Sequence, residues 1–128
     1  MAQRQVPVYI SFDYDHDSNL KTMLAGQAKL GDSPFSIADW SIKVPSSDWK
    51  DKARARIRRV EQVIILCGLY AGSATGIDAE IGIARDEKKP YFLLAAPGGA
   101  KRPKASSASD TLYKWTWPNL KALIAGKR

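Results

Sequence analysis

The stretch Gln62-Val63-Ile64-Ile65-Leu66-Cys67 is almost continuous hydrophobic sequence in a chain of 128 residues. Such a run is typical of a strand buried on both faces of a parallel sheet. Residues 90–95 (Pro-Tyr-Phe-Leu-Leu-Ala) form a second run of this kind. The segment between them predicts a helix over about Ile77 to Glu87, with Thr75 and Asp78 as a capping box. This strand, helix and strand indicate a βαβ unit at the centre of the fold.

The rest of the chain continues the alternation of strands and helices. Further strands are expected at 6–12, at 35–40 and, more briefly, at 112–115. Further helices are expected from Asp17 or Ser18 to about 30, from Ser47 or Asp48 to 60, and over 118–125. Alternation at this spacing predicts one α/β domain over residues 1–128, flavodoxin-like, with about five parallel strands and helices on both faces. Residues 97–110, rich in Gly, Pro, Ser, Ala and Lys, are expected to form a flexible loop.

Composition excludes several classes of protein. Hydrophobic residues make up 45% of the chain and charged residues 26%, which are values for a globular domain. No apolar run approaches the ~20 residues that span a membrane, and the first residues contain no apolar signal region. A cytoplasmic protein without a membrane segment is therefore expected. One cysteine and one histidine disfavour an internal disulfide and a zinc or histidine-rich metal site, so we expect neither metal nor cofactor.

The net charge of +7 raises the question of an anionic partner. Seven basic and two acidic residues lie between Lys43 and Arg59, and they predict a basic helix face over 50–59. That face could bind nucleic acid. A solvated basic face is more common, and no aromatic residues interleave it to stack on bases, so nucleic acid is the less favoured partner.

Ligand sites in this fold class gather at the carboxyl ends of the strands. After the first strand comes Asp13-Tyr14-Asp15-His16-Asp17, which would repel the phosphate of a flavin. After the third strand comes Cys67-Gly68, so the phosphoacceptor aspartate of a response-regulator receiver is missing. A Walker A or dinucleotide glycine motif is also absent.

Glu80 is the outstanding candidate on the third expected helix. At 100° per residue it falls between Ala84 and Ile83, inside the apolar arc that faces the sheet. It also lies near the start of the helix, at the carboxyl edge. Desolvation would raise its pKa and the helix dipole would lower it. A first-turn acid that merely favours the helix N-terminus is the structural alternative.

Other side chains at the strand ends allow two interpretations each. Asp13 and Asp15 could hold Mg²⁺ or could cap the next helix. His16 could be a general base or a solvated loop residue. Trp40 and Trp49 could stack on a ring, although Trp49 lies on an apolar helix stripe and is expected in the core. Cys67 is expected to be an inert core residue.

Two segments resemble a known family. Val8-Tyr9-Ile10-Ser11-Phe12-Asp13-Tyr14-Asp15 is similar to the opening strand of TIR-like domains, especially the ThsB type of Thoeris antiphage defence. Gly68-Leu69-Tyr70 through Ala79-Glu80-Ile81-Gly82-Ile83-Ala84, followed by Lys89-Pro90-Tyr91-Phe92-Leu93, resembles the loop, helix and next strand of the same domains. The likeness covers most of residues 6–95.

The resemblance implies an enzyme that cleaves the nicotinamide glycosidic bond of NAD, with Glu80 as the catalytic residue. It further implies a cyclic ADP-ribose-type product that activates a separate effector protein, and possible self-association or filament formation. NAD is then a substrate and no cofactor is needed. Residues at the strand ends where the pocket would form are predicted to bind NAD: Ser11, Phe12, Asp13, Asp39 and Trp40.

Three alternatives remain open from the sequence. A nucleoside deoxyribosyltransferase-like enzyme shares this type of sheet and uses a glutamate against an N-glycosidic bond. A non-catalytic TIR-like protein-interaction module needs no catalytic Glu80. A nucleic-acid binder would use the basic helix face, and its binding would be steeply salt-dependent.

Overall fold

The protein forms one five-stranded, all-parallel sheet in the strand order β2-β1-β3-β4-β5. The computed structural model describes residues 5–41, 48–107 and 109–127. The strands are β1 (Val6–Ser11), β2 (Phe35–Trp40), β3 (Gln62–Cys67), β4 (Tyr91–Ala95) and β5 (Leu112–Lys114). This order is that of flavodoxin-like sheets, so the predicted fold class is confirmed.

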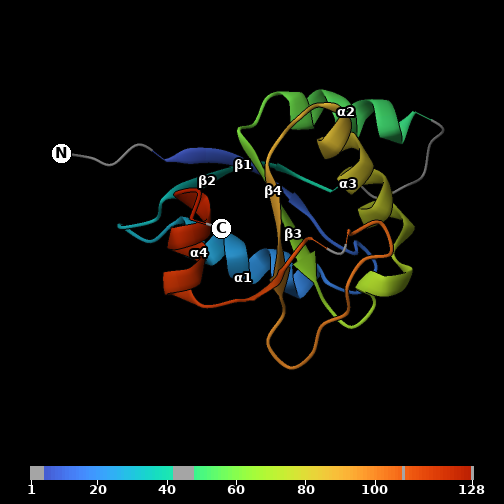
Figure 1. Ribbon diagram of the computed structural model, residues 1–128. Helices are drawn as coiled ribbons and strands as arrows, with labels where there is room; N and C mark the ends of the chain where they lie inside the picture. The colour runs from blue at the N-terminus through green and yellow to red at the C-terminus, as the bar shows by residue number, and fades with distance from the viewer. Residues whose placement is uncertain (1–4, 42–47, 108, 128) are drawn as a thin grey trace.

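Helices cover both faces of the sheet, as Figure 1 shows. They are α1 (Ser18–Ala28), α2 (Trp49–Arg58), the short 3₁₀ helix η1 (Ala71–Ser73), α3 (Thr75–Asp86) and α4 (Trp117–Ile124). Helices α1 and α4 pack on one face, and α2 and α3 pack on the other. Among the described residues, none of these helices has both the length and the apolar character needed to cross a membrane.

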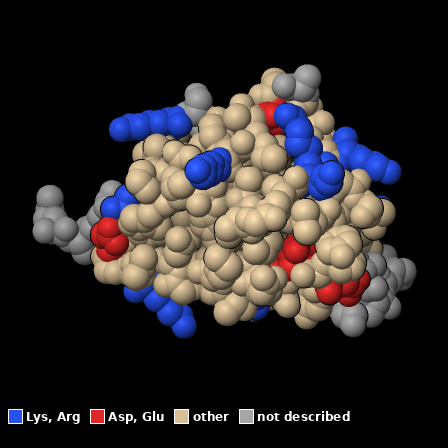
Figure 2. Space-filling view, turned by 90° about the horizontal axis from the view of Figure 1, so that it is seen from below, with Lys and Arg blue, Asp and Glu red and all other residues tan. Residues whose placement is uncertain are grey.

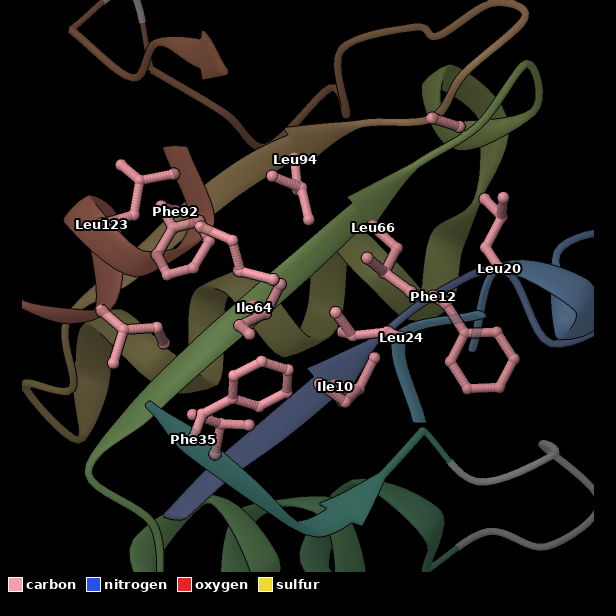
Figure 3. Close-up of a cluster of buried hydrophobic side chains, with 14 residues drawn as sticks. Ile10, Phe12, Leu20, Leu24, Phe35, Ile64, Leu66, Phe92, Leu94 and Leu123 are labelled. Carbon is pink, nitrogen blue, oxygen red and sulfur yellow. The ribbon is translucent and has the colours of Figure 1, made fainter. Parts of the chain in front are cut away.

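Strand alternation divides the core into two layers. Val8 and Ile10 of β1 pack toward α1 and α4, with Leu24 and Phe35 in the same cluster (Figure 3). Tyr9, between them in sequence, points to the opposite face and joins the cluster of α2 and α3. Because side chains alternate along a strand, residues two apart share a face. Tyr9 and Ser11 are therefore both directed toward α3.

The predicted capping box of α3 is wrong. The helix begins at Thr75, so Ala74 is the N-cap residue, and no side chain caps the helix. The carboxylate of Asp78 instead accepts a hydrogen bond from the backbone N–H of Ala105 at 2.9 Å. Asp78 therefore bonds to a residue far away in the sequence and does not cap the start of its own helix.

Asp17 and Asp48 occupy the N-cap positions of α1 and α2, but neither side chain makes a capping hydrogen bond. Ser47, the other candidate for α2, lies outside the described residues. An aspartate can thus occupy the N-cap position of a helix without making the capping hydrogen bond that its residue type predicts.

Several hydrogen bonds attach the described residues after β4 to the body of the domain, among them one from the backbone N–H of Lys101 to the Gly68 carbonyl at 3.0 Å. Besides the bond from Ala105 to Asp78, Asp110 accepts hydrogen bonds from the Tyr91 hydroxyl at 2.7 Å and from the Ser107 backbone N–H at 2.9 Å. The flexibility expected for residues 97–110 stays a prediction.

Candidate functional site

Glu80 is a buried carboxylate with three hydroxyl donors. It is 2% exposed. The Ser11 hydroxyl donates to its Oε1 at 2.8 Å and the Ser41 hydroxyl donates to the same atom at 2.5 Å. The Tyr9 hydroxyl donates to Oε2. Such a cluster can hold a negative charge away from water, since hydrogen bonds to an ionised group are stronger than neutral ones.

The sheet register explains why these side chains meet. Tyr9 and Ser11 project from β1 on the face that α3 covers. The pairing of β1 with β2 shifts between Val8 and Tyr9, so that Ile10 pairs with Trp40. One residue further along lie Ser11 and Ser41, and the N–H of Ser41 donates to the Ile10 carbonyl at 2.8 Å. The irregular register therefore brings Ser41 to Glu80.

Burial controls the protonation of Glu80. Desolvation raises its pKa from 4.5 to about 7, against the opposing effect of the hydroxyls of Ser41, Tyr9 and Ser11. Burial, and then the charge of Glu80, also raise the pKa of the Tyr9 phenol. Near neutral pH the Glu80 carboxyl can thus exist in either form, which is the property expected of a functional carboxylate rather than a surface one.

Glu80 forms part of the wall of a cavity of about 500 Å³. The other walls come from the β1–α1 loop, Ser41, the start of α2, and the segment from η1 into α3. All of these lie after the carboxyl ends of strands, where ligands bind in sheets of this type. The volume falls within the range of small-molecule sites, roughly 300–1,000 Å³.

Three of the five predicted binding residues lie at this site. Ser11 bonds to Glu80, and Phe12 and Asp13 line the cavity. The residues that line it do not include Asp39 or Trp40. Asp39 accepts a hydrogen bond from Arg56 at 2.9 Å. Trp40 is 42% exposed, and its ring lies under the ammonium of Lys21.

Sequence reasoning missed Tyr9 and Ser41 as hydrogen-bond partners of Glu80. Tyr9 precedes Ser11 by two residues in a predicted strand, and this spacing could have placed both on one face. Trp49, expected in the core, is half-buried and lines the cavity beside Glu80. The prediction for Cys67 is confirmed, because the side chain is fully buried and burial raises the pKa of the thiol to about 12.

Asp13 makes hydrogen bonds within its own loop. Its Oδ2 lies 2.8 Å from Nδ1 of His16, and its Oδ1 accepts from the N–H of Asp15 at 3.1 Å. In the part of the chain that the structure describes, no group of three His, Cys, Asp or Glu side chains is placed to hold a metal ion.

The arginines of α2 are occupied by acidic partners. Arg54 donates to Glu87 at 2.7 Å, and Nε of Arg58 donates to the same carboxylate at 2.8 Å. Arg56 is paired with Asp39. Figure 2 shows the molecule from below, on the side away from α2, and the middle of that face carries mostly uncharged side chains. Pairing of these arginines lowers the positive potential that a nucleic acid would need.

The parallel five-stranded sheet defines the class as a flavodoxin-like α/β domain, and this arrangement is consistent with a TIR-like domain. The model of the family described as Thoeris protein ThsB, TIR-like domain, matches residues 9–102. Because the match covers well over half of the chain, the protein belongs to this family, which places it among TIR-like proteins of antiphage defence. A search of curated proteins gave no match.

Proposed function

We propose that the protein cleaves the nicotinamide glycosidic bond of NAD and that Glu80 is the catalytic carboxylate. The observation that carries this proposal is the position of Glu80, a buried carboxylate with three hydroxyl donors that forms part of the wall of a cavity of about 500 Å³ at the carboxyl edge of the sheet. Membership of the TIR-like family supports the same reaction.

The chemistry suits one carboxylate. Nicotinamide leaves as a neutral molecule when the bond from its ring nitrogen to the ribosyl carbon breaks and the electron pair passes to that nitrogen. The transition state is oxocarbenium-like, and a nearby carboxylate stabilises its positive charge. The pKa of Glu80, about 7, leaves a large ionised fraction at neutral pH.

The lining of the cavity includes groups of both charges, and these suggest how NAD could lie in it. The N-terminus of α3, which no side chain caps, and Lys50 both contribute to its lining. Backbone N–H groups at a helix N-terminus bind phosphate oxygens, so the diphosphate is placed there. Asp13, Asp15 and Glu80 contribute the negative part of the lining, which favours the cationic nicotinamide ribosyl group.

We propose further that the product is a cyclic ADP-ribose-type signal that activates a separate effector protein. Cyclisation requires that water be excluded and that a nucleophile of the same substrate be held near the ribosyl carbon. Self-association or filament formation could complete such an enclosed site.

The test is nicotinamide release from NAD by the purified protein and by Glu80→Gln, with the products identified by mass spectrometry. Lysates of phage-infected cells that express each form are assayed in parallel, because activation can require infection. Release by the wild type and its loss in Glu80→Gln are expected. The product mass separates cyclic from linear ADP-ribose. Turnover of deoxynucleosides in place of NAD would favour a deoxyribosyltransferase-like enzyme instead.

One observation favours the interaction-module alternative. Three hydroxyl donors and 2% exposure are also what a structural buried carboxylate needs. No turnover in either setting, by a folded wild-type protein, would overturn the enzyme proposal and support this alternative.

A further inference from the structure

His16, the single histidine of the chain, is held in place on two sides. Its Nδ1 lies 2.8 Å from Oδ2 of Asp13. Its ring stacks on the ring of Tyr70, with the centroids 3.9 Å apart and the planes inclined by 18°. The edge of the imidazole is thus fixed by the loop after β1 and its face by the loop after β3.

Asp13 is itself fixed by the backbone around it. Its Oδ1 accepts from the N–H of Asp15, and its carbonyl accepts from the N–H of Asp17 at 2.8 Å. The Asp13 side chain is 11% exposed, whereas that of His16 is 47% exposed. The carboxylate is therefore a sheltered support and the imidazole is the accessible member of the pair.

The pair lies in the wall of the cavity that contains Glu80. His16 and Asp13 both line that cavity, and His16 also lines a smaller neighbouring one of about 240 Å³ together with Tyr70 and Asp17. Among the described residues, Nε2 of His16 has no hydrogen-bond partner. The accessible imidazole thus belongs to the same site as the buried carboxylate.

A carboxylate that accepts from Nδ1–H selects one neutral form of the ring, in which Nε2 carries the lone pair. The same logic orients the base in hydrolase triads, where a third group holds the imidazole in the correct tautomer.

We propose that His16 is the general base of the second half of the reaction, with Asp13 and Tyr70 as its positioning residues. This inference rests on the proposed function. After nicotinamide has left, an O–H group of water or of the substrate attacks the ribosyl carbon. A C–O bond forms, the O–H bond breaks, and the proton passes to Nε2 of His16 and then to solvent.

The first test does not depend on turnover. Because the chain has one histidine, ¹⁵N NMR of the imidazole reports this ring alone. At high pH the wild type is expected to hold the Nδ1–H tautomer, and Asp13→Asn to shift the population toward Nε2–H. Asp15→Asn, which removes the same charge from the same loop, is expected to leave the tautomer unchanged. A wild type already in the Nε2–H form would overturn the proposal.

The second test compares nucleophiles that must lose a proton when they attack the ribosyl carbon with a nucleophile that has no proton to lose. NAD is turned over in the presence of 3-acetylpyridine, whose ring nitrogen attacks without losing a proton. Capture by an O–H group gives linear ADP-ribose from water or the cyclic product from a substrate hydroxyl. His16→Asn, which can keep a donor near Asp13, is expected to lower both O–H products by about 10²-fold relative to the exchanged dinucleotide.

The outcomes are distinguishable from those of the proposed function. An unchanged product ratio in His16→Asn, with nicotinamide still released by the wild type, would overturn the role of His16 and leave the NAD reaction standing. No nicotinamide release by the folded wild type would overturn both, while the tautomer would still show whether Asp13 orients the ring.

Discussion

Ser41 donates a hydrogen bond to Oε1 of Glu80 at 2.5 Å and so joins the end of β2 to the first turns of α3. The same Ser41 oxygen accepts from the backbone N–H of Phe12 at 3.0 Å. One side chain therefore links the second strand, the first strand and the buried carboxylate. The protonation of Glu80 depends on this link, since the Ser41 hydroxyl lowers a pKa that burial raises.

Ser41→Ala is expected to raise the pKa of Glu80 above its value of about 7. Loss of one hydrogen bond to an ionised group is worth about 1.5 kcal/mol, or about one pKa unit. The chain has three glutamates, so ¹³C NMR of labelled carboxyl carbons resolves the titration. Ser73→Ala is the control, because Ser73 lines the cavity but donates to the Tyr70 carbonyl. Equal titration curves in wild type and Ser41→Ala would contradict the expectation.

Glu80→Gln is expected to change the pH dependence of stability. In the folded protein the pKa of Glu80 is raised from 4.5 to about 7. Protonated Glu80 therefore contributes its whole stabilisation, relative to the variant, below pH 4.5. This contribution to the free energy of unfolding is lost as the pH rises through about 7. The predicted loss is roughly 3 kcal/mol.

Urea unfolding of both proteins at about pH 4 and about pH 8 measures this difference. A wild type that responds to pH as the variant does would show that burial does not destabilise the ionised form of Glu80.

Some of this site follows from sequence and some does not. The inward position of Glu80 could be predicted from helical periodicity. The position of β3 could be predicted because a strand that is buried on both faces has a continuous hydrophobic sequence. Ser41 has no such signal. Its contact with Glu80 depends on the register shift between β1 and β2, which arises from packing between distant segments.

Contacts between distant segments also explain why the capping box predicted for α3 and the core position predicted for Trp49 were wrong. Asp78 has the residue type and position of a capping acid, but the backbone of Ala105 provides a better-placed donor. Trp49 begins a helix stripe whose later members, Ala53 and Ile57, are buried. At the first position of α2 the stripe extends beyond the core and meets the cavity.

Asp78→Ala is expected to speed hydrogen exchange at the Ala105 amide, which donates to the Asp78 carboxylate at 2.9 Å. A hydrogen bond worth about 1 kcal/mol slows local opening by roughly fivefold. Asp51→Ala, which removes the first-turn acid of α2, is the control. Equal rates of exchange at the Ala105 amide in the wild type and in Asp78→Ala would show that this hydrogen bond does not hold the segment around Ala105 in place.

Gly68→Ala is expected to destabilise the protein by roughly 1–3 kcal/mol. A Cβ at this position would lie 2.4 Å from Oδ2 of Asp17. Asp17 is 7% exposed, and its Oδ2 has no hydrogen-bond partner among the described residues. The carboxylate would have to shift to make room for the Cβ, and its burial makes that shift unfavourable.

A double-mutant cycle with Asp17→Ala tests this cause by urea unfolding. The cost of Gly68→Ala should fall when Asp17 is already truncated. A cost that is the same in both backgrounds would assign it to the backbone and not to the carboxylate.

The central claim is that the Glu80 carboxylate is the group with which the protein cleaves NAD. Its most direct test compares the rates of nicotinamide release by Glu80→Gln and Glu87→Gln. The rates are measured at about pH 8, where Glu80 is ionised. Glu87 follows α3 and pairs with Arg54 and Arg58, away from the cavity, so its variant controls for the loss of a glutamate near the same helix. We predict a fall of about 10²–10³-fold in Glu80→Gln and a rate near that of the wild type in Glu87→Gln. Equal rates in the two folded variants would contradict the claim.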